Sequence, residues 1–190
     1  MDQLRTVVFA SVAMALCPIF AEAQSSAPAG PVVAHNTAPA PRFGFLAGPS
    51  KSDVAWSTNG DELAQRIELQ DPADQLSTGV ADAIAKRKGG TVVGGGRADY
   101  TVTVGTMEWS AGYYVPSRPT YNVKYAAQLS ITDASGAVVK TASCQVMPDD
   151  RESAGSNDEF VAHKGRTLKT MMAKAAADCL RTLVSKTKSL

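Results

Sequence analysis

The chain has 190 residues with 19 basic and 18 acidic side chains, which gives a formal net charge of +1 at pH 7. This balance implies neither a nucleic-acid partner nor a strongly acidic substrate. Hydrophobic residues make up 44% of the chain, and its length is that of one ordinary domain, so one core is expected.

The N-terminus has the form of a secretory signal peptide. Residues 6–20 are apolar or small and carry no charge, and the run is shorter than the roughly 20 residues of a membrane-spanning helix. It ends at Ala21-Glu22-Ala23, a small-x-small pattern of the kind that signal peptidase cuts after. We therefore expect residues 1–23 to be removed and the mature protein to be periplasmic or secreted. The alternative is a buried N-terminal helix, which Pro18 would interrupt.

Cys17 raises the alternative of a lipid anchor. A lipidated cysteine directly follows the cleavage point and needs a small residue before it. Cys17 follows the bulky Leu16 and precedes Pro18, so we expect no lipid there.

Residues 24–41 contain four prolines, no formal charge and no strand or helix periodicity. Such a composition buries too little apolar surface to offset the entropy of ordering the chain. It predicts a disordered Pro/Ala-rich tether. The remaining residues, 42–190, are expected to form a single α+β domain.

The first elements of that domain are short. Residues 42–46 and 53–57 place apolar side chains at every second position, which is typical of strands. Asn59-Gly60 favours a tight hairpin, with residues 63–69 as the partner strand. Asp61 could instead cap a helix, so 63–69 remains open between strand and helix.

A helix begins more clearly at Asp71-Pro72, because an acidic cap and a proline both suit a helix start. It is expected to end at Gly89-Gly90 after a basic last turn. The glycines at 94–96 predict a turn, since no Lys-Ser or Lys-Thr of a phosphate loop follows them. The alternating strand after that turn shifts its apolar register at Gly105, which predicts a β-bulge.

Two further strands and a closing helix complete the domain. Apolar residues at every odd position of 121–131 predict a strand with one buried face, and a turn at 133–136 leads to a return strand at 138–146. Ser156 and Glu159 form a capping box, after which the periodicity predicts a long helix. The fold class is therefore α+β, with a single antiparallel-rich sheet and two helices packed on one face.

Cys144 on the return strand and Cys179 on the closing helix are both expected to face the core. They are the two cysteines that remain after signal removal, and an exported protein folds in an oxidising compartment. We predict a disulfide between them. The alternative is two buried free thiols that act as small hydrophobic groups.

The sequence contains no pattern typical of an enzyme or a metal site. His35 falls in the predicted tether and His163 on the polar side of the closing helix. Neither a C-x-x-C pair nor a G-x-S-x-G elbow occurs, and the acidic residues between 149 and 159 lack calcium-loop spacing. We therefore predict no catalytic residues, no metal and no cofactor.

Aromatic residues gather at 108–125, and their clustering predicts a binding loop. Tyrosine, tryptophan and arginine anchor many interfaces. The candidate residues are Trp109, Tyr113, Tyr114 and Arg118. The alternative is that this loop folds over the sheet edge as a satellite cluster.

The closing helix is a second candidate surface, because basic residues dominate its exposed side. A solvated face explains this composition, and a weak contact with an anionic membrane or cell-wall surface is the functional alternative.

The element order and two segments carry a family resemblance. The segments are GGTVVGGGRADYTVTVGTME at 89–108 and YAAQLSITDASGAVV at 125–139. Over about residues 71–184 the chain resembles small bacterial envelope proteins similar to the penicillin-binding-protein activator and curli-secretion lipoproteins. This resemblance implies an envelope location and a non-enzymatic role.

We therefore expect a non-enzymatic envelope protein that binds a protein or cell-wall partner through the aromatic loop. The alternatives are a structural or oligomer-forming subunit and an uncharacterised hydrolase.

Overall fold

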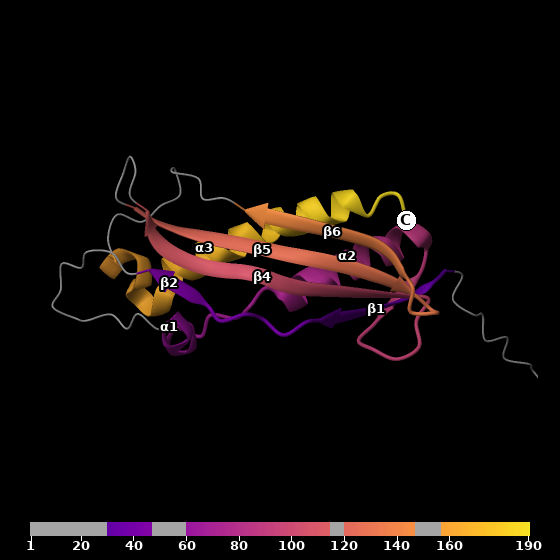
Figure 1. Ribbon diagram of the computed structural model, residues 1–190, viewed down its shortest axis with the longest axis horizontal. Coiled ribbons are helices and arrows are strands. Elements are labelled where there is room, and N and C mark those ends of the chain that lie inside the picture. The colour runs from indigo at the N-terminus through magenta and orange to yellow at the C-terminus, as the bar shows by residue number, and fades with distance from the viewer. Residues whose placement is uncertain (1–29, 47–59, 115–119, 147–156) are drawn as a thin grey trace, which may run out of the picture.

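A computed structural model of the chain describes residues 30–46, 60–114, 120–146 and 157–190 (Figure 1). The elements, in chain order, are β1 (Val32–Thr37), β2 (Gly44–Leu46), α1 (Gly60–Arg66), α2 (Ala73–Lys88), β3 (Thr91–Val93), β4 (Tyr100–Tyr114), β5 (Thr120–Asp133), β6 (Val138–Val146) and α3 (Asn157–Lys186). The strands form one sheet in the order β3-β1-β4-β5-β6, and β2 also pairs with β4.

The fold class is α+β, as the sequence predicts, but the sheet is mixed. β4, β5 and β6 are antiparallel neighbours, whereas β1 is parallel to both β3 and β4, and β2 is parallel to β4. The expected antiparallel-rich sheet therefore describes only its β4–β5–β6 half. The parallel pairings were not predicted.

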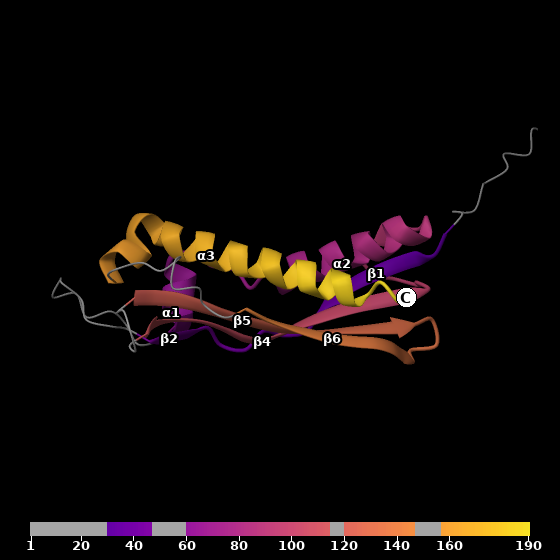
Figure 2. The ribbon, with the colours of Figure 1, turned by 90° about the horizontal axis from the view of Figure 1, so that it is seen from above.

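Helices α2 and α3 lie side by side on one face of the sheet (Figure 2). The core lies between these layers, where α2 packs over β1 and β4, and α3 packs over β5 and β6. Its fully buried members include Val80, Ile84, Val102, Leu129, Ile131, Leu168 and Leu183. The predicted two-layer arrangement is confirmed, with the short helix α1 added beside β2.

Strand β1 corrects the prediction of a tether over 24–41. Residues 32–37 of that stretch form a strand between β3 and β4, and Val33 is fully buried. The tether prediction is wrong for these residues. The strand contributes only Val33 and Ala34 to the core, and the neighbouring strands supply the rest of it. His35 consequently lies on a strand.

Helix α1 decides the choice that the sequence left open for 63–69, and it excludes the strand. Leu63, Ala64 and Ile67 are all buried, and this spacing is that of one face of a helix. The predicted hairpin at Asn59-Gly60 is absent, because Gly60 begins α1. The strand predicted at 53–57 lies outside the described residues.

Helix α2 forms where the sequence predicts it. Asp71 accepts a hydrogen bond from the amide of Ala73 at 3.3 Å, and Gly89 closes the helix in the left-handed conformation at φ 66°. The predicted bulge in β4 also occurs, but between Thr106 and Glu108 and not at Gly105.

Helix α3 is interrupted near its start. Residues 162–165 are not helical, and three of them, including His163, have positive φ angles. The prediction that His163 lies on the polar side of a continuous helix is therefore wrong. The capping box at Ser156 falls outside the described residues.

The turn between β5 and β6 is built by one carboxylate. Asp133 accepts hydrogen bonds from the hydroxyl and amide of Ser135 and from the amide of Ala137. These bonds, led by that of the Ser135 hydroxyl, lower the pKa of Asp133 below its ordinary value. The predicted turn at 133–136 is confirmed.

Candidate functional site

The predicted binding residues lie at the far end of the β4–β5 hairpin. Tyr113 and Tyr114 are the last residues of β4, where their backbones pair with Tyr121 and Thr120 of β5. They were expected at a loop tip, but they belong to a strand. Arg118 lies outside the described residues.

Trp109 is buried, whereas the sequence predicts it at the surface as a binding residue. Its side chain is only 8% exposed. The indole N–H donates a hydrogen bond to the carbonyl of Pro41 at 2.7 Å, and the ring meets Phe43 edge-on with centroids 5.0 Å apart. Trp109 is therefore a core residue, and its burial removes it from any contact surface.

The bulge in β4 explains why Trp109 turns inward. Before the bulge, Val104 and Thr106 face the helices. The extra residue, Met107, is 60% exposed, and the register then brings Trp109 opposite Tyr125 on the buried side. The sequence signalled the shift but not which residue would occupy the bulge.

Stacked aromatic rings connect the hairpin end to β2 and α3. The Tyr121 ring stacks on Phe160 of α3 with centroids 5.1 Å apart, and on Phe45 of β2 with centroids 6.4 Å apart. Tyr121 is fully buried. These contacts attach the base of the hairpin end to two other elements, so its backbone is held in a defined position.

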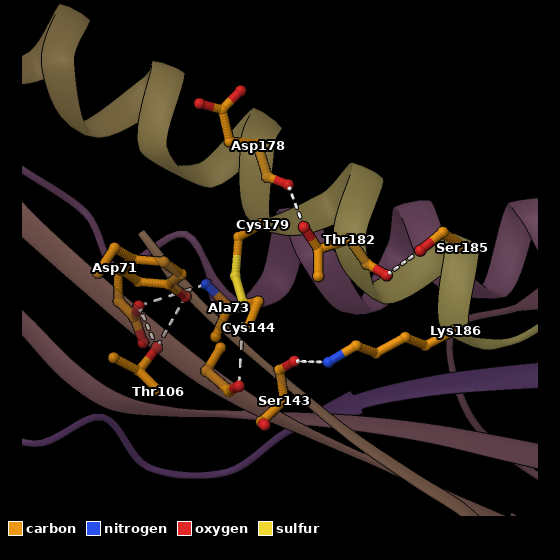
Figure 3. Close-up of a disulfide and its surroundings, with 12 residues drawn as sticks. Asp71, Ala73, Thr106, Ser143, Cys144, Asp178, Cys179, Thr182, Ser185 and Lys186 are labelled. Atoms are coloured by element: carbon orange, nitrogen blue, oxygen red, sulfur yellow. Dashed lines mark hydrogen bonds between the residues drawn. A yellow bond between two sulfur atoms is a disulfide. The ribbon is translucent and has the colours of Figure 1, made fainter. Parts of the chain in front are cut away.

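A buried polar cluster joins α2 to the sheet (Figure 3). The Thr106 hydroxyl donates a hydrogen bond to the Asp71 carboxylate at 2.6 Å, and it lies 3.0 Å from the Tyr125 hydroxyl. Either hydroxyl can be the donor in the hydrogen bond between Thr106 and Tyr125. Sequence analysis placed Tyr125 on the buried face and Asp71 at the helix start, but nothing in the pattern linked them.

This cluster links the start of α2 to the sheet. Thr106 is only 7% exposed, so a substrate does not reach its hydroxyl. An open pocket of about 390 Å³ nearby is lined by the 37–40 segment and by Asp71, Ala73 and Asp74, but it contains no nucleophile paired with a base. His35, on β1, lies 4.0 Å from Asp74 and 3.4 Å from the Thr78 hydroxyl.

Burial dominates the ionisation of Tyr125. It raises the pKa of the phenol well above its ordinary value, the hydrogen bond with Thr106 opposes the rise, and the negative charge of Asp71 adds to it. Above about pH 10 the unfolded chain loses this proton while the folded chain keeps it. Stability conferred by the neutral phenol is therefore complete below pH 10 and declines as the pH rises further.

We expect Tyr125→Phe to abolish that part of the alkaline destabilisation, because phenylalanine has no proton to lose. The measurement is urea unfolding of both proteins between pH 9 and pH 11. The difference between their unfolding free energies should shrink or reverse in favour of the variant as the pH rises. An unchanged difference would show that Tyr125 titrates alike in both states.

The disulfide is a covalent link between the helix layer and the sheet. Cys144 of β6 is bonded to Cys179 of α3, with Cα atoms 5.3 Å apart (Figure 3). Both residues are buried. About two turns further along α3, Lys186 donates a hydrogen bond to the Ser143 carbonyl at 2.8 Å. The predicted pairing and the predicted inward direction of both cysteines agree with the structure.

Among the described residues, no three His, Cys, Asp or Glu side chains gather closely enough to hold a metal ion. Over the same ranges, no helix is both long enough and apolar enough to cross a membrane.

No family model matches the chain, and no curated protein matches its sequence. Similar solved structures include a Xanthomonas campestris protein of family DUF330, with 11% identity, a TM-score of 0.42, and coverage of 85% of this chain and 88% of that chain. A minor lipoprotein from Acinetobacter baumannii has 8% identity, a TM-score of 0.37, and coverage of 81% and 92%. PelC from Paraburkholderia phytofirmans, solved as a dodecamer, has 13% identity, a TM-score of 0.33, and coverage of 80% and 90%. Bacterial lipoproteins thus stand among the similar structures.

Proposed function

We propose that this chain is a non-enzymatic, exported envelope protein that binds a protein or cell-wall partner through the end of the β4–β5 hairpin. The contact residues are Tyr113, Tyr114 and Arg118. Trp109 supports them from the core and does not touch the partner.

The observation that carries this proposal is the anchored base of the hairpin end. Tyr113 and Tyr114 end β4, and Tyr113 pairs with Tyr121 of β5. The ring of Tyr121 stacks on Phe45 and on Phe160. A tyrosine pair on a fixed backbone loses little entropy on binding, which is what an interface anchor needs.

Export belongs to the same proposal. The disulfide between Cys144 and Cys179 suits an oxidising compartment, and cleavage after Ala23 would deliver the chain there. The lipoproteins among the similar structures give no support to our expectation that Cys17 carries no lipid. The intact mass of the exported protein distinguishes a chain starting at Gln24 from one starting at a lipidated Cys17.

The test is site-specific photocross-linking in cells that export the protein. A photoreactive amino acid at position 114 should give an adduct with one envelope component, whereas the same group at the exposed Gln128 in the middle of β5 should give none. Binding to purified cell-wall sacculi, or to the cross-linked protein once purified, then measures affinity.

In that assay we expect Tyr113→Ala/Tyr114→Ala to weaken binding at least tenfold, because buried tyrosine anchors typically contribute this much or more. A matched double variant, Thr141→Ala/Ser143→Ala, removes two exposed side chains of β6 and should bind like the wild type. Equal binding by both double variants contradicts the proposal. An adduct with a second copy of the chain at position 114 would favour the structural-subunit alternative.

A further inference from the structure

Basic side chains collect at the end of the molecule opposite the hairpin end. The last turn of α2 carries Lys86, Arg87 and Lys88, and Lys188, just past the end of α3, lines a groove together with the first two. In Figures 1 and 2 the chain's C-terminus marks this end. Favourable interaction with the helix dipoles explains basic residues at helix ends, but not the groove that they surround.

The groove has an apolar floor and a cationic rim. It is open, has a volume of about 690 Å³, and lies between the ends of α2 and α3. Ala83 and Val184 form its floor, and Lys86, Arg87 and Lys188 surround it. An amphiphile with an anionic head satisfies both parts of this surface, whereas a simple inorganic anion satisfies only the rim.

The basic side chains divide into two groups by their contacts. Arg87 donates two hydrogen bonds of 3.0 Å to Thr187, and Lys88 donates one to the backbone oxygen of Leu190, so both hold the C-terminal segment in place. Lys86 and Lys188 are exposed, and within the described part of the chain neither makes a hydrogen bond or ion pair. Their charges therefore remain available to an external anion.

The N-terminal side of the chain enters the sheet at this same end. The amide of Thr91, three residues beyond α2, donates a hydrogen bond to the Pro31 carbonyl at 3.1 Å. The amide of Asp99 donates one to the Val32 carbonyl at 2.8 Å. Only seven residues, 24–30, separate this point from the predicted signal peptide, a reach of at most about 25 Å. A signal peptide in the bilayer would therefore keep the basic end of the folded domain within this distance of the membrane.

We propose that this basic end, the groove between the C-terminal ends of α2 and α3, docks on the surface of a bilayer containing anionic phospholipid. Phosphate head groups meet Lys86 and Lys188, and the apolar floor receives the glycerol and upper acyl region. This surface joins Lys188, one of the basic residues that the sequence suggested for a membrane contact, to the end of α2, and it is independent of the proposed hairpin contact. Tyr100 and Tyr114 mark the two ends of β4, which lie about 45 Å apart along an extended strand, so docking here would point the hairpin end away from the membrane.

The test is co-sedimentation of the exported protein with vesicles of phosphatidylcholine alone or with added phosphatidylglycerol. We expect binding only to the anionic vesicles and a steep loss of binding as salt is added. Each lysine near an anionic surface contributes roughly a fivefold gain in binding, so Lys86→Gln/Lys188→Gln should weaken it about 30-fold.

The matched control removes the same charge from the other end of α3, in Lys164→Gln/Arg166→Gln. All four side chains are exposed, so both variants should keep the wild-type thermal midpoint. Equal binding to neutral and anionic vesicles overturns the proposal. So does an equal loss of binding in both variants, because that result would reflect net charge alone.

Discussion

Replacing Cys144 and Cys179 together by alanine is expected to lower the free energy of unfolding by about 3–4 kcal/mol. The disulfide closes a loop with a sequence separation of 35 residues, and removing such a crosslink restores that much entropy to the unfolded chain. For a domain of this size the thermal midpoint should fall by about 10 °C. Urea unfolding of the wild type with and without reductant, beside the double variant, measures the effect.

The position of the disulfide also predicts which part of the fold loosens. Cys179 lies on the half of α3 that covers β5 and β6. Two hydrogen bonds also join β6 to this end of the chain, from Lys186 to the Ser143 carbonyl and from Lys140 to the Ser189 hydroxyl. Amide exchange should therefore rise first in the second half of α3 and in β6. The wild type should resist alkylation until reductant is added. Free reaction of both cysteines without reductant would contradict the crosslink.

The elements with strong local patterns were predictable from sequence. Strand β5 alternates apolar and polar residues along its length, and α2 has clear start and stop signals in Asp71 and Gly89. These signals need no knowledge of the rest of the fold. Cys144 and Cys179 could be paired because each sits on such an element, with its inward direction set by the local period.

Strand β1 could not be predicted in this way. Its stability comes from parallel pairing with β3 and β4, whose partners lie about 60 residues away in the chain, and its local composition favours disorder. Parallel strands are specified by long-range contacts, which a local window does not contain.

The hairpin prediction at Asn59-Gly60 failed for a different reason. Asn59-Gly60 is a strong hairpin signal, but Gly60 is needed here for close packing. A β-carbon on Gly60 would lie 1.9 Å from the carbonyl oxygen of Phe43. The glycine therefore serves a tertiary contact and not a tight turn.

The candidate site was predictable only in outline. The sequence placed aromatic residues near the β4–β5 connection, which is where the hairpin ends. It did not show that Trp109 is buried, because that depends on Met107 being the bulged residue. The basic groove was also missed, since its two walls come from helices about a hundred residues apart.

Trp109→Ala is expected to destabilise the fold by about 3–5 kcal/mol, since it empties a large core site. The substitution removes the edge contact with Phe43 and leaves the Pro41 carbonyl without its donor. Trp109→Phe keeps a ring in the site and loses only the hydrogen bond and part of the volume, so a smaller loss is expected. Urea unfolding of both variants measures the two costs.

Met107→Ala is the matched control, because Met107 lies two residues away on β4 but is 60% exposed. Its unfolding free energy should stay within about 0.5 kcal/mol of the wild type. If Trp109 is a core residue, any loss of partner binding in Trp109→Ala will follow the unfolded fraction and recover under conditions where the variant is fully folded. A fully stable Trp109→Ala variant that no longer binds would instead show that Trp109 contacts the partner. That result would contradict the inward register that the bulge imposes on β4.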